Sequence, residues 1–214
     1  MDTWLQFRLY HAVPIDSQRN LWDDRQYDRT RLWQPASHVR KSGGANMSFK
    51  EMKPEELQKN PFTMIGREWL LVTAEKDGKA NTMTASWGGV GVMWGKNVAF
   101  IVIRPQRYTK EFIDGSEGFS LSVLDETFRK TYSYLGSVSG RDEDKIAKSG
   151  LTLSHEGATP YFEEANTVLV CRKLYAQEYT PDCFLDNTPN EKWYPDKDYH
   201  TMYIAEIEKV LVRE

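Results

Sequence analysis

Residues 68–87 read EWLLVTAEKDGKANTMTASW, and this stretch predicts a β-hairpin. Its first half, Glu68 to Glu75, is apolar and rich in residues that favour strands, and the return half runs from Ala80 to Trp87. Between them, Lys76-Asp-Gly-Lys79 contains the Asp-Gly pair that is typical of a tight hairpin turn. The hairpin favours antiparallel pairing in this part of the chain.

The residues after this hairpin are also rich in strands. Asn97 to Ile103 is the most apolar run, and Phe119 to Leu124 alternates as a half-buried strand does. Two late strands are expected at Thr167 to Ala176 and at Thr201 to Leu211. The polar, aromatic stretch from Pro181 to Asp198 between them is expected to be a loop.

Short helices are expected between these strands. One begins at Arg104-Pro105, one covers Phe128 to Val138, and a capped one lies within Asp142 to Gly150. Gly88-Gly-Val-Gly91 is expected to form a bend or bulge. Because helices and strands do not alternate strictly, the pattern predicts a β-rich α+β fold, an antiparallel barrel or sandwich with inserted helices.

Composition excludes several classes of protein. The 214 residues carry 28 basic and 31 acidic side chains, a net charge of −3, which does not suit a nucleic-acid-binding surface. The longest uncharged stretch, Ala80 to Gly95, is too rich in Thr, Ser, Asn and Gly to cross a membrane. Two cysteines, Cys171 and Cys183, are too few for a disulfide scaffold. We expect a cytoplasmic globular protein.

The first 46 residues differ from the rest. They contain seven basic residues, six of them Arg, and five acidic ones, with no sustained period of 2 or 3.6. We expect residues 1–46 to be an extension, either disordered or a non-native leader, and residues 47–214 to be the folded domain. The alternative is an interaction arm rich in Arg and Trp, around Trp22 and Trp33.

Standard catalytic motifs are missing from the sequence. It contains no G-x-G-x-x-G, Walker loop, G-x-S-x-G or H-E-x-x-H pattern. The four histidines are far apart from each other and from the cysteines, so no metal site is expected: His11, His38, His155 and His200.

The return strand of the hairpin is the first candidate binding segment. In an extended strand Thr82, Thr84 and Ser86 share one face. The other face carries Asn81, Met83, Ala85 and Trp87. The hydroxyl face is either the solvated side of a sheet or a groove for a polar, planar or phosphorylated ligand.

Arg104-Pro-Gln-Arg-Tyr-Thr109 is the second candidate segment. Proline near a helix start leaves free backbone N–H groups that favour an anion, and Arg104, Arg107 and Thr109 add further donors. The alternative is an ordinary helix start with two solvated arginines.

Several segments together resemble the flavin reductase-like, FMN-binding split-barrel family, and its flavoredoxin-like branch in particular. The resemblance extends from Phe62 to Val212. It is carried by Trp69-Leu-Leu-Val-Thr-Ala, Asn81-Thr-Met-Thr-Ala-Ser-Trp-Gly-Gly, Trp94-Gly-Lys, Arg104-Pro-Gln-Arg-Tyr-Thr and Asp198-Tyr-His-Thr-Met-Tyr-Ile-Ala-Glu-Ile.

The resemblance implies a homodimer of split β-barrels with FMN near the subunit interface. By position, Asn81 to Trp87 would line the flavin and its ribityl chain, and Arg104, Arg107, Tyr108 and Thr109 would hold the phosphate. His200 would lie near the redox face, where an imidazole that titrates near neutrality could exchange a proton. Ala205 stands where the family usually has Gly.

The implied function is an oxidoreductase that passes electrons from NADH or NADPH through FMN to a small molecule or a protein redox partner. Two alternatives remain open: a flavoprotein that only carries electrons between proteins, and a module that binds flavin without turnover. Fold resemblance alone does not choose among them.

Overall fold

The computed structural model describes residues 48–214, so the expectations for residues 1–46 lie outside the described residues. The strands are β1 (Phe49–Met52), β2 (Leu70–Lys76), β3 (Lys79–Ala85), β4 (Gly88–Met93), β5 (Lys96–Ile103), β6 (Gly118–Leu124), β7 (Leu153–Glu156), β8 (Thr159–Phe162), β9 (Ala165–Glu178) and β10 (Thr201–Arg213). The α-helices are α1 (Pro61–Thr63), α2 (Thr109–Gly115), α3 (Arg129–Ser137), α4 (Lys145–Ser149) and α5 (Thr188–Trp193).

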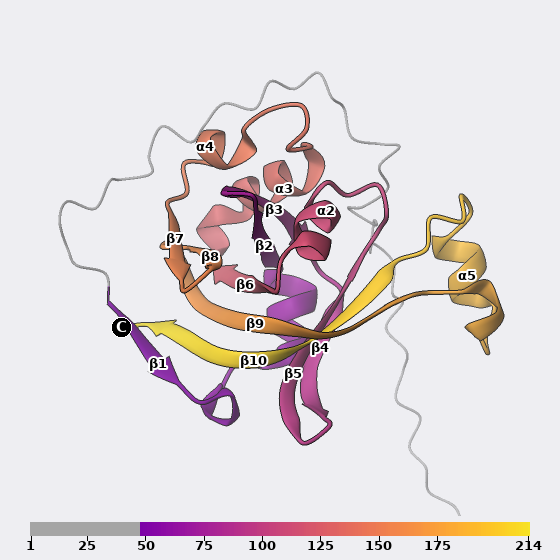
Figure 1. The fold of residues 1–214 in the computed structure, drawn as a ribbon, viewed down its shortest axis with the longest axis horizontal. Helices are drawn as coiled ribbons and strands as arrows, with labels where there is room; N and C mark the ends of the chain where they lie inside the picture. Colours follow the sequence, from indigo (N-terminus) through magenta and orange to yellow (C-terminus); the bar gives the residue numbers. More distant parts are fainter. Residues whose placement is uncertain (1–47) are drawn as a thin grey trace, which may run out of the picture. The chain divides into compact units, whose positions relative to one another are not determined.

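One antiparallel sheet contains all strands except the separate β7–β8 hairpin. Its order is β3-β2-β6-β9-β10-β5-β4, with β1 added beside β10 (Figure 1). β9 pairs along one edge of β10, while residues 201–206 of the other edge pair with β5 and residues 210–213 pair with β1. The sheet does not close, because β3 and β4 stand at the two ends of this order.

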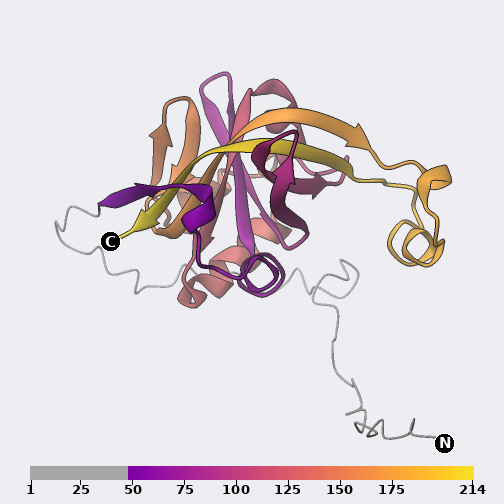
Figure 2. The same ribbon diagram turned by 90° about the horizontal axis from the view of Figure 1, so that it is seen from below.

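The core lies against this sheet. Apolar side chains of β2, β5, β6, β9 and β10 bury one another together with Phe112 and Ile113 of α2. Burial of this apolar surface is the main stabilising contribution to such a fold. α5 lies away from the core, at the end of the β9–β10 pair opposite the C-terminus, as the two views in Figures 1 and 2 show.

The antiparallel β-rich fold with helices between strands is confirmed. The hairpin predicted at residues 68–87 forms as β2 and β3, with Leu70 paired to Ala85 and Lys76 to Lys79. The bend expected at residues 88–91 is wrong, because these residues belong to β4, which pairs with β5. The glycines there permit a close approach: a Cβ on Gly88 would lie 2.4 Å from the Phe100 carbonyl oxygen.

Three further differences arise where tertiary contacts decide the local structure. β1 and the β7–β8 hairpin were not anticipated, and the loop expected at residues 181–198 contains α5. The helix expected at Arg104-Pro105 begins only at Thr109. Its start is delayed because residues 104–107 first form a turn, in which the Arg107 N–H donates to the Arg104 carbonyl at 3.1 Å.

Residues 48–214 contain neither a membrane-spanning helix nor a cluster of metal-binding side chains. Every helix there is too short or too polar to cross a lipid bilayer. The same residues bring together no group of three or more His, Cys, Asp and Glu side chains that could hold a metal ion.

Candidate functional site

The hydroxyls of Thr82 and Thr84 on β3 are buried and have partners within the protein. The Thr82 hydroxyl lies 2.9 Å from that of Thr73 on β2. The Thr84 hydroxyl donates to the Tyr132 carbonyl at 2.6 Å and so joins β3 to α3. These two groups are neither solvated nor open to a ligand, whereas Ser86 is half-buried. The open hydroxyl groove expected from the sequence is therefore not formed by Thr82 and Thr84.

The other face of β3 packs as its alternation predicts. Met83 and Ala85 belong to the main core. Asn81 is 3% exposed, and its side-chain amide donates to the Thr109 hydroxyl at 2.9 Å. This hydrogen bond brings the start of the first candidate segment to the end of the second. Trp87, just past β3, is 38% exposed.

Positive charge gathers around Tyr108, next to the Asn81–Thr109 hydrogen bond. The Arg141 guanidinium lies 4.5 Å from the centroid of the Tyr108 ring, and the Lys79 ammonium lies 5.8 Å from it. Arg141 also forms an ion pair with Glu111, while Lys79 forms none within residues 48–214. The surplus of positive charge makes this end of the site suited to an anion.

Arg104 and Arg107 bind different elements of the protein. Arg107 donates to the Gly136 carbonyl at the end of α3, at 2.6 Å. Arg104 forms an ion pair with Asp198 and donates to the Trp193 carbonyl at 2.8 Å. The sequence predicted both arginines at one phosphate, but in the structure their guanidinium groups have different partners: Trp193 and Asp198 for Arg104, and Gly136 for Arg107.

The Arg104 end is built from aromatic rings around His200. The Tyr194 hydroxyl lies 2.9 Å from Nδ1 of His200, and the Trp87 ring centroid lies 5.3 Å from that of the imidazole. Trp193 meets Trp87 edge to face, with centroids 4.9 Å apart. The Arg104 guanidinium stands over the Tyr194 ring at 5.3 Å. These rings form an apolar wall with one buried imidazole in it.

His200 is neutral at pH 7 in this setting. Burial, together with the positive charges of Arg104 and, to a smaller extent, Arg107, lowers the pKa of His200 to about 4, although Asp198 opposes the shift. Desolvation penalises the charged imidazolium, which is the usual cause of a lowered histidine pKa. The near-neutral titration expected from the sequence does not occur in the protein without a ligand.

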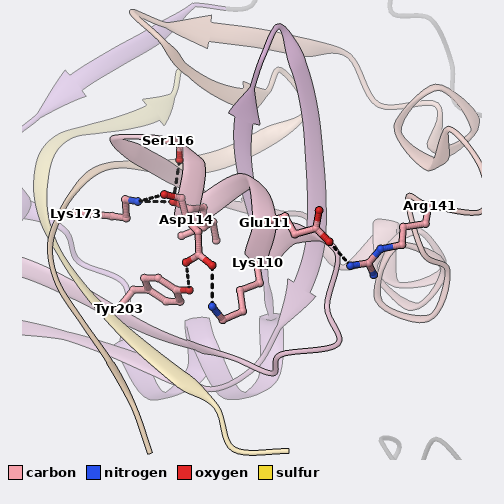
Figure 3. A network of polar contacts seen from close by, with 8 residues as sticks. Lys110, Glu111, Asp114, Ser116, Arg141, Lys173 and Tyr203 are labelled. Carbon is pink, nitrogen blue, oxygen red and sulfur yellow. Dashed lines mark hydrogen bonds and ion pairs between the residues drawn. The ribbon is translucent and has the colours of Figure 1, made fainter.

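Helix α2, which follows Tyr108 and Thr109, is fixed by a polar network at its C-terminal end (Figure 3). The Asp114 carboxylate accepts from the Tyr203 hydroxyl at 2.5 Å and from Lys110 at 2.7 Å. Lys173 donates to the carbonyls of Ile113 and Asp114. Because β9 and β10 carry Lys173 and Tyr203, the sheet holds α2 and with it the Asn81–Thr109 contact.

The site therefore has a cationic end and an aromatic end, joined by β3. Asn81 on β3 is bonded to Thr109 at the cationic end, and Trp87, two residues past the end of β3, lies beside His200 at the aromatic end. Four of its residues were not identified from the sequence: Lys79, Arg141, Trp193 and Asp198. No local pattern marks the first three, whereas Asp198 stands in one of the segments that carry the family resemblance.

Comparison with known proteins identifies related domains. Residues 63–214 match the sequence profile described as "Flavin reductase like domain". No curated protein sequence matches the chain.

Solved structures share the fold. An FMN-binding domain of a flavin reductases-like enzyme from Shewanella baltica OS155 is 18% identical over 79% of each chain, with a TM-score of 0.58. Flavoredoxin of Desulfovibrio vulgaris (Miyazaki F) is 21% identical over 81% of this chain and 75% of its own, with a TM-score of 0.55. The flavin reductase PheA2 is 16% identical over 69% of this chain and 80% of its own, with a TM-score of 0.51. The predicted split-barrel fold is thereby confirmed.

The lowered pKa of His200 predicts how stability depends on pH. Between the pKa of about 4 in the folded protein and about 6.5 in the unfolded chain, the unfolded chain binds more protons. The contribution of His200 to the free energy of unfolding is therefore fully present above pH 6.5 and is lost as the pH falls towards 4. From pH 6.5 to 4.5, wild type should lose about 2 kcal/mol more of its free energy of unfolding than His200→Gln. Urea unfolding at both pH values measures this, and identical losses in the two proteins would contradict the burial of a neutral imidazole.

Proposed function

The chain belongs to the family of flavin reductase-like domains, and we propose that it is an FMN-binding oxidoreductase that takes electrons from NADH or NADPH. The acceptor of those electrons is a small molecule or a protein. The observation that carries the proposal is the pairing of a cationic end around Tyr108 with an aromatic end around Trp87 and His200. A cofactor with a phosphate at one end and a planar ring at the other matches this pairing.

We assign the phosphate to the cationic end. Arg107, Tyr108 and Thr109 would hold it, as the sequence suggested, with Lys79 and Arg141 adding charge. Charge-assisted hydrogen bonds from guanidinium to phosphate are among the strongest polar contacts in proteins. Arg104 is reassigned to the aromatic end, since Asp198 and Trp193 already bind it there.

Residues 81–87 would bind the middle of the cofactor, mainly through the backbone. β3 stands at the end of the strand order and pairs only with β2 among the described strands, so the backbone groups of its outer edge have no strand partner. Ser86 adds a half-buried hydroxyl. Such groups suit the hydroxyls of a ribityl chain, whose donors and acceptors they complement.

The aromatic end would face the flavin ring. Bound FMN supplies the hydride and electron chemistry, and the protein supplies orientation and shielding from water. Trp87 and Trp193 would exclude solvent there, and His200 would serve as a neutral hydrogen-bonding group beside the ring. His200 is thus the candidate catalytic residue, with a proton held at one ring nitrogen and Tyr194 at Nδ1.

We further propose that the domain comprises residues 47–214 and forms a homodimer in the cytoplasm. Tyr194, in the aromatic stretch between β9 and β10, is buried within the protein. Exposed apolar side chains lie instead on the β4–β5 hairpin, where Val92 is 74% and Trp94 is 60% exposed.

Light scattering of the full chain, and of a chain beginning at Met47, should give a dimer mass for both. A monomer mass would contradict the proposed dimer. Loss of folding in the chain that begins at Met47 would contradict the proposed domain boundary. Recovery of the protein with membranes after cell fractionation would contradict the proposed location.

Replacing each arginine should separate the phosphate end from the ring end. Arg107→Ala removes a charged donor worth roughly 1.5–3 kcal/mol, so FMN should bind about tenfold more weakly or worse. Riboflavin, which lacks the phosphate, should bind Arg107→Ala as it binds wild type. Arg104→Ala, the matched control, should weaken both flavins in parallel because it releases the Asp198 and Trp193 contacts.

Titration of FMN and riboflavin by quenching of flavin fluorescence measures both affinities. Thr109→Ala should resemble Arg107→Ala with a smaller effect, since a neutral hydroxyl is a weaker donor than a guanidinium. Parallel weakening of both flavins by Arg107→Ala would show that the phosphate binds elsewhere. A colourless protein that does not quench FMN would refute the proposed cofactor.

Rapid mixing with nicotinamide nucleotides distinguishes the proposed reductase from its two alternatives. We expect NADH or NADPH to bleach the absorbance of the bound flavin, since the neighbouring flavin reductase and flavin reductases-like structures point to that class. An electron carrier, the alternative favoured by the flavoredoxin neighbour, would be reduced only by a protein donor. Bound flavin that responds to neither donor would indicate a module without turnover.

A further inference from the structure

The C-terminal end of α3 is bound by two cations that come from different parts of the chain. Arg107 donates to the Gly136 carbonyl at 2.6 Å. Lys145, from α4, donates to the carbonyls of Leu135 and Val138 at 3.0 and 2.9 Å. The last carbonyls of a helix have no partners within the helix, and they carry the negative end of its dipole. The two side chains therefore act together on one helix end.

Lys145 is unusual because it is 4% exposed. The charged group that acts on its ammonium from another element is Arg107, in the 104–107 turn. The two carboxylates just before Lys145 in the sequence have other partners. Glu143 binds Lys148 and the Tyr134 hydroxyl, and Asp144 caps α4 by accepting from the Ala147 N–H. A buried ammonium with no carboxylate bound to it is costly, and its carbonyl contacts offset that cost.

The loop after α3 connects this helix end to the cationic end of the site. Gly140 lies against Asn81, where an added Cβ would stand 2.3 Å from the amide oxygen. The next residue, Arg141, covers the Tyr108 ring and donates to the Gln106 carbonyl at 3.2 Å. The position of the α3 end thus sets the position of both Arg107 and Arg141.

We propose that Lys145 is a positioning residue for phosphate binding: by holding the carbonyls of Leu135 and Val138 it keeps Arg107 and Arg141 beside Tyr108 and Thr109. This inference rests on the proposed function, since it assumes that the phosphate of FMN binds there. Lys145 would not touch the phosphate itself, because its ammonium already donates to the carbonyls of Leu135 and Val138.

The buried charge of Lys145 would couple binding of the phosphate to protonation of the Lys145 side chain. Burial, followed by the charge of Arg107, lowers the pKa of Lys145 to about 7, and a nearby anion favours the protonated form. FMN should therefore bind more tightly while Lys145 is charged, and riboflavin should not respond. If the phosphate raises the pKa by one unit, the preference for FMN over riboflavin falls roughly fivefold from pH 7 to pH 9.

The test compares Lys145→Met and Lys145→Arg with wild type. Both flavins are titrated by fluorescence quenching at pH 7, 8 and 9, and the melting temperature of each protein is recorded. Lys148→Met is the matched control, because Lys148 lies on the same helix, is exposed and pairs with Glu143. Lys145→Met should bind FMN about tenfold more weakly with riboflavin nearly unchanged, and Lys148→Met should change neither.

Lys145→Arg keeps its charge over this pH range, so its preference for FMN should not vary with pH, unlike that of wild type. A wild-type preference that stays constant from pH 7 to pH 9 would overturn the inference, even if Lys145→Met fails to fold. If Lys145→Met weakens the binding of FMN and of riboflavin equally, Lys145 has only a structural role and the inference is wrong. A wild type that binds FMN no better than riboflavin would refute the proposed phosphate site instead.

Discussion

The antiparallel ladder between β9 and β10 is the constraint on which the rest of the structure depends. These strands have 14 and 13 residues, and their outer edges bind β6 on one side and β5 and β1 on the other. Buried backbone groups need partners, so the register of one ladder fixes its neighbours. Thr201 pairs with Ile103, and the next residues along, His200 and Arg104, are therefore brought to the same place.

Between Arg104 and Arg107 the chain passes from the aromatic end of the site to its cationic end. Arg104 lies among the aromatic rings of residues 193–200, whereas Arg107 binds the end of α3. A turn at residues 104–107 lies between the two arginines before α2 begins at Thr109. One short segment thus supplies both ends of the candidate site.

Burial decides how the polar groups of this site can act. His200 and Lys145 are both desolvated, which lowers the pKa of each, but the consequences differ. His200 is neutral over the physiological range, so it suits hydrogen bonding beside a ring. The pKa of Lys145, at about 7, lies within that range, and on this the proposed coupling to an anion depends. The hydroxyls of Thr82 and Thr84 are bonded within the protein, so they are not available to the proposed ligand.

Local periodicity and turn chemistry were enough to predict the hairpin at residues 68–87, the buried strand at 97–103 and the antiparallel, β-rich class. The sequence also marked the two segments that meet through Asn81 and Thr109. Three further features could be known only from the folded chain: Arg104 and Arg107 have different partners, Lys79 and Arg141 flank Tyr108, and Lys145 is buried. Those outcomes depend on contacts between residues that are distant in the chain, and no local pattern records which carbonyl or ring a side chain will meet.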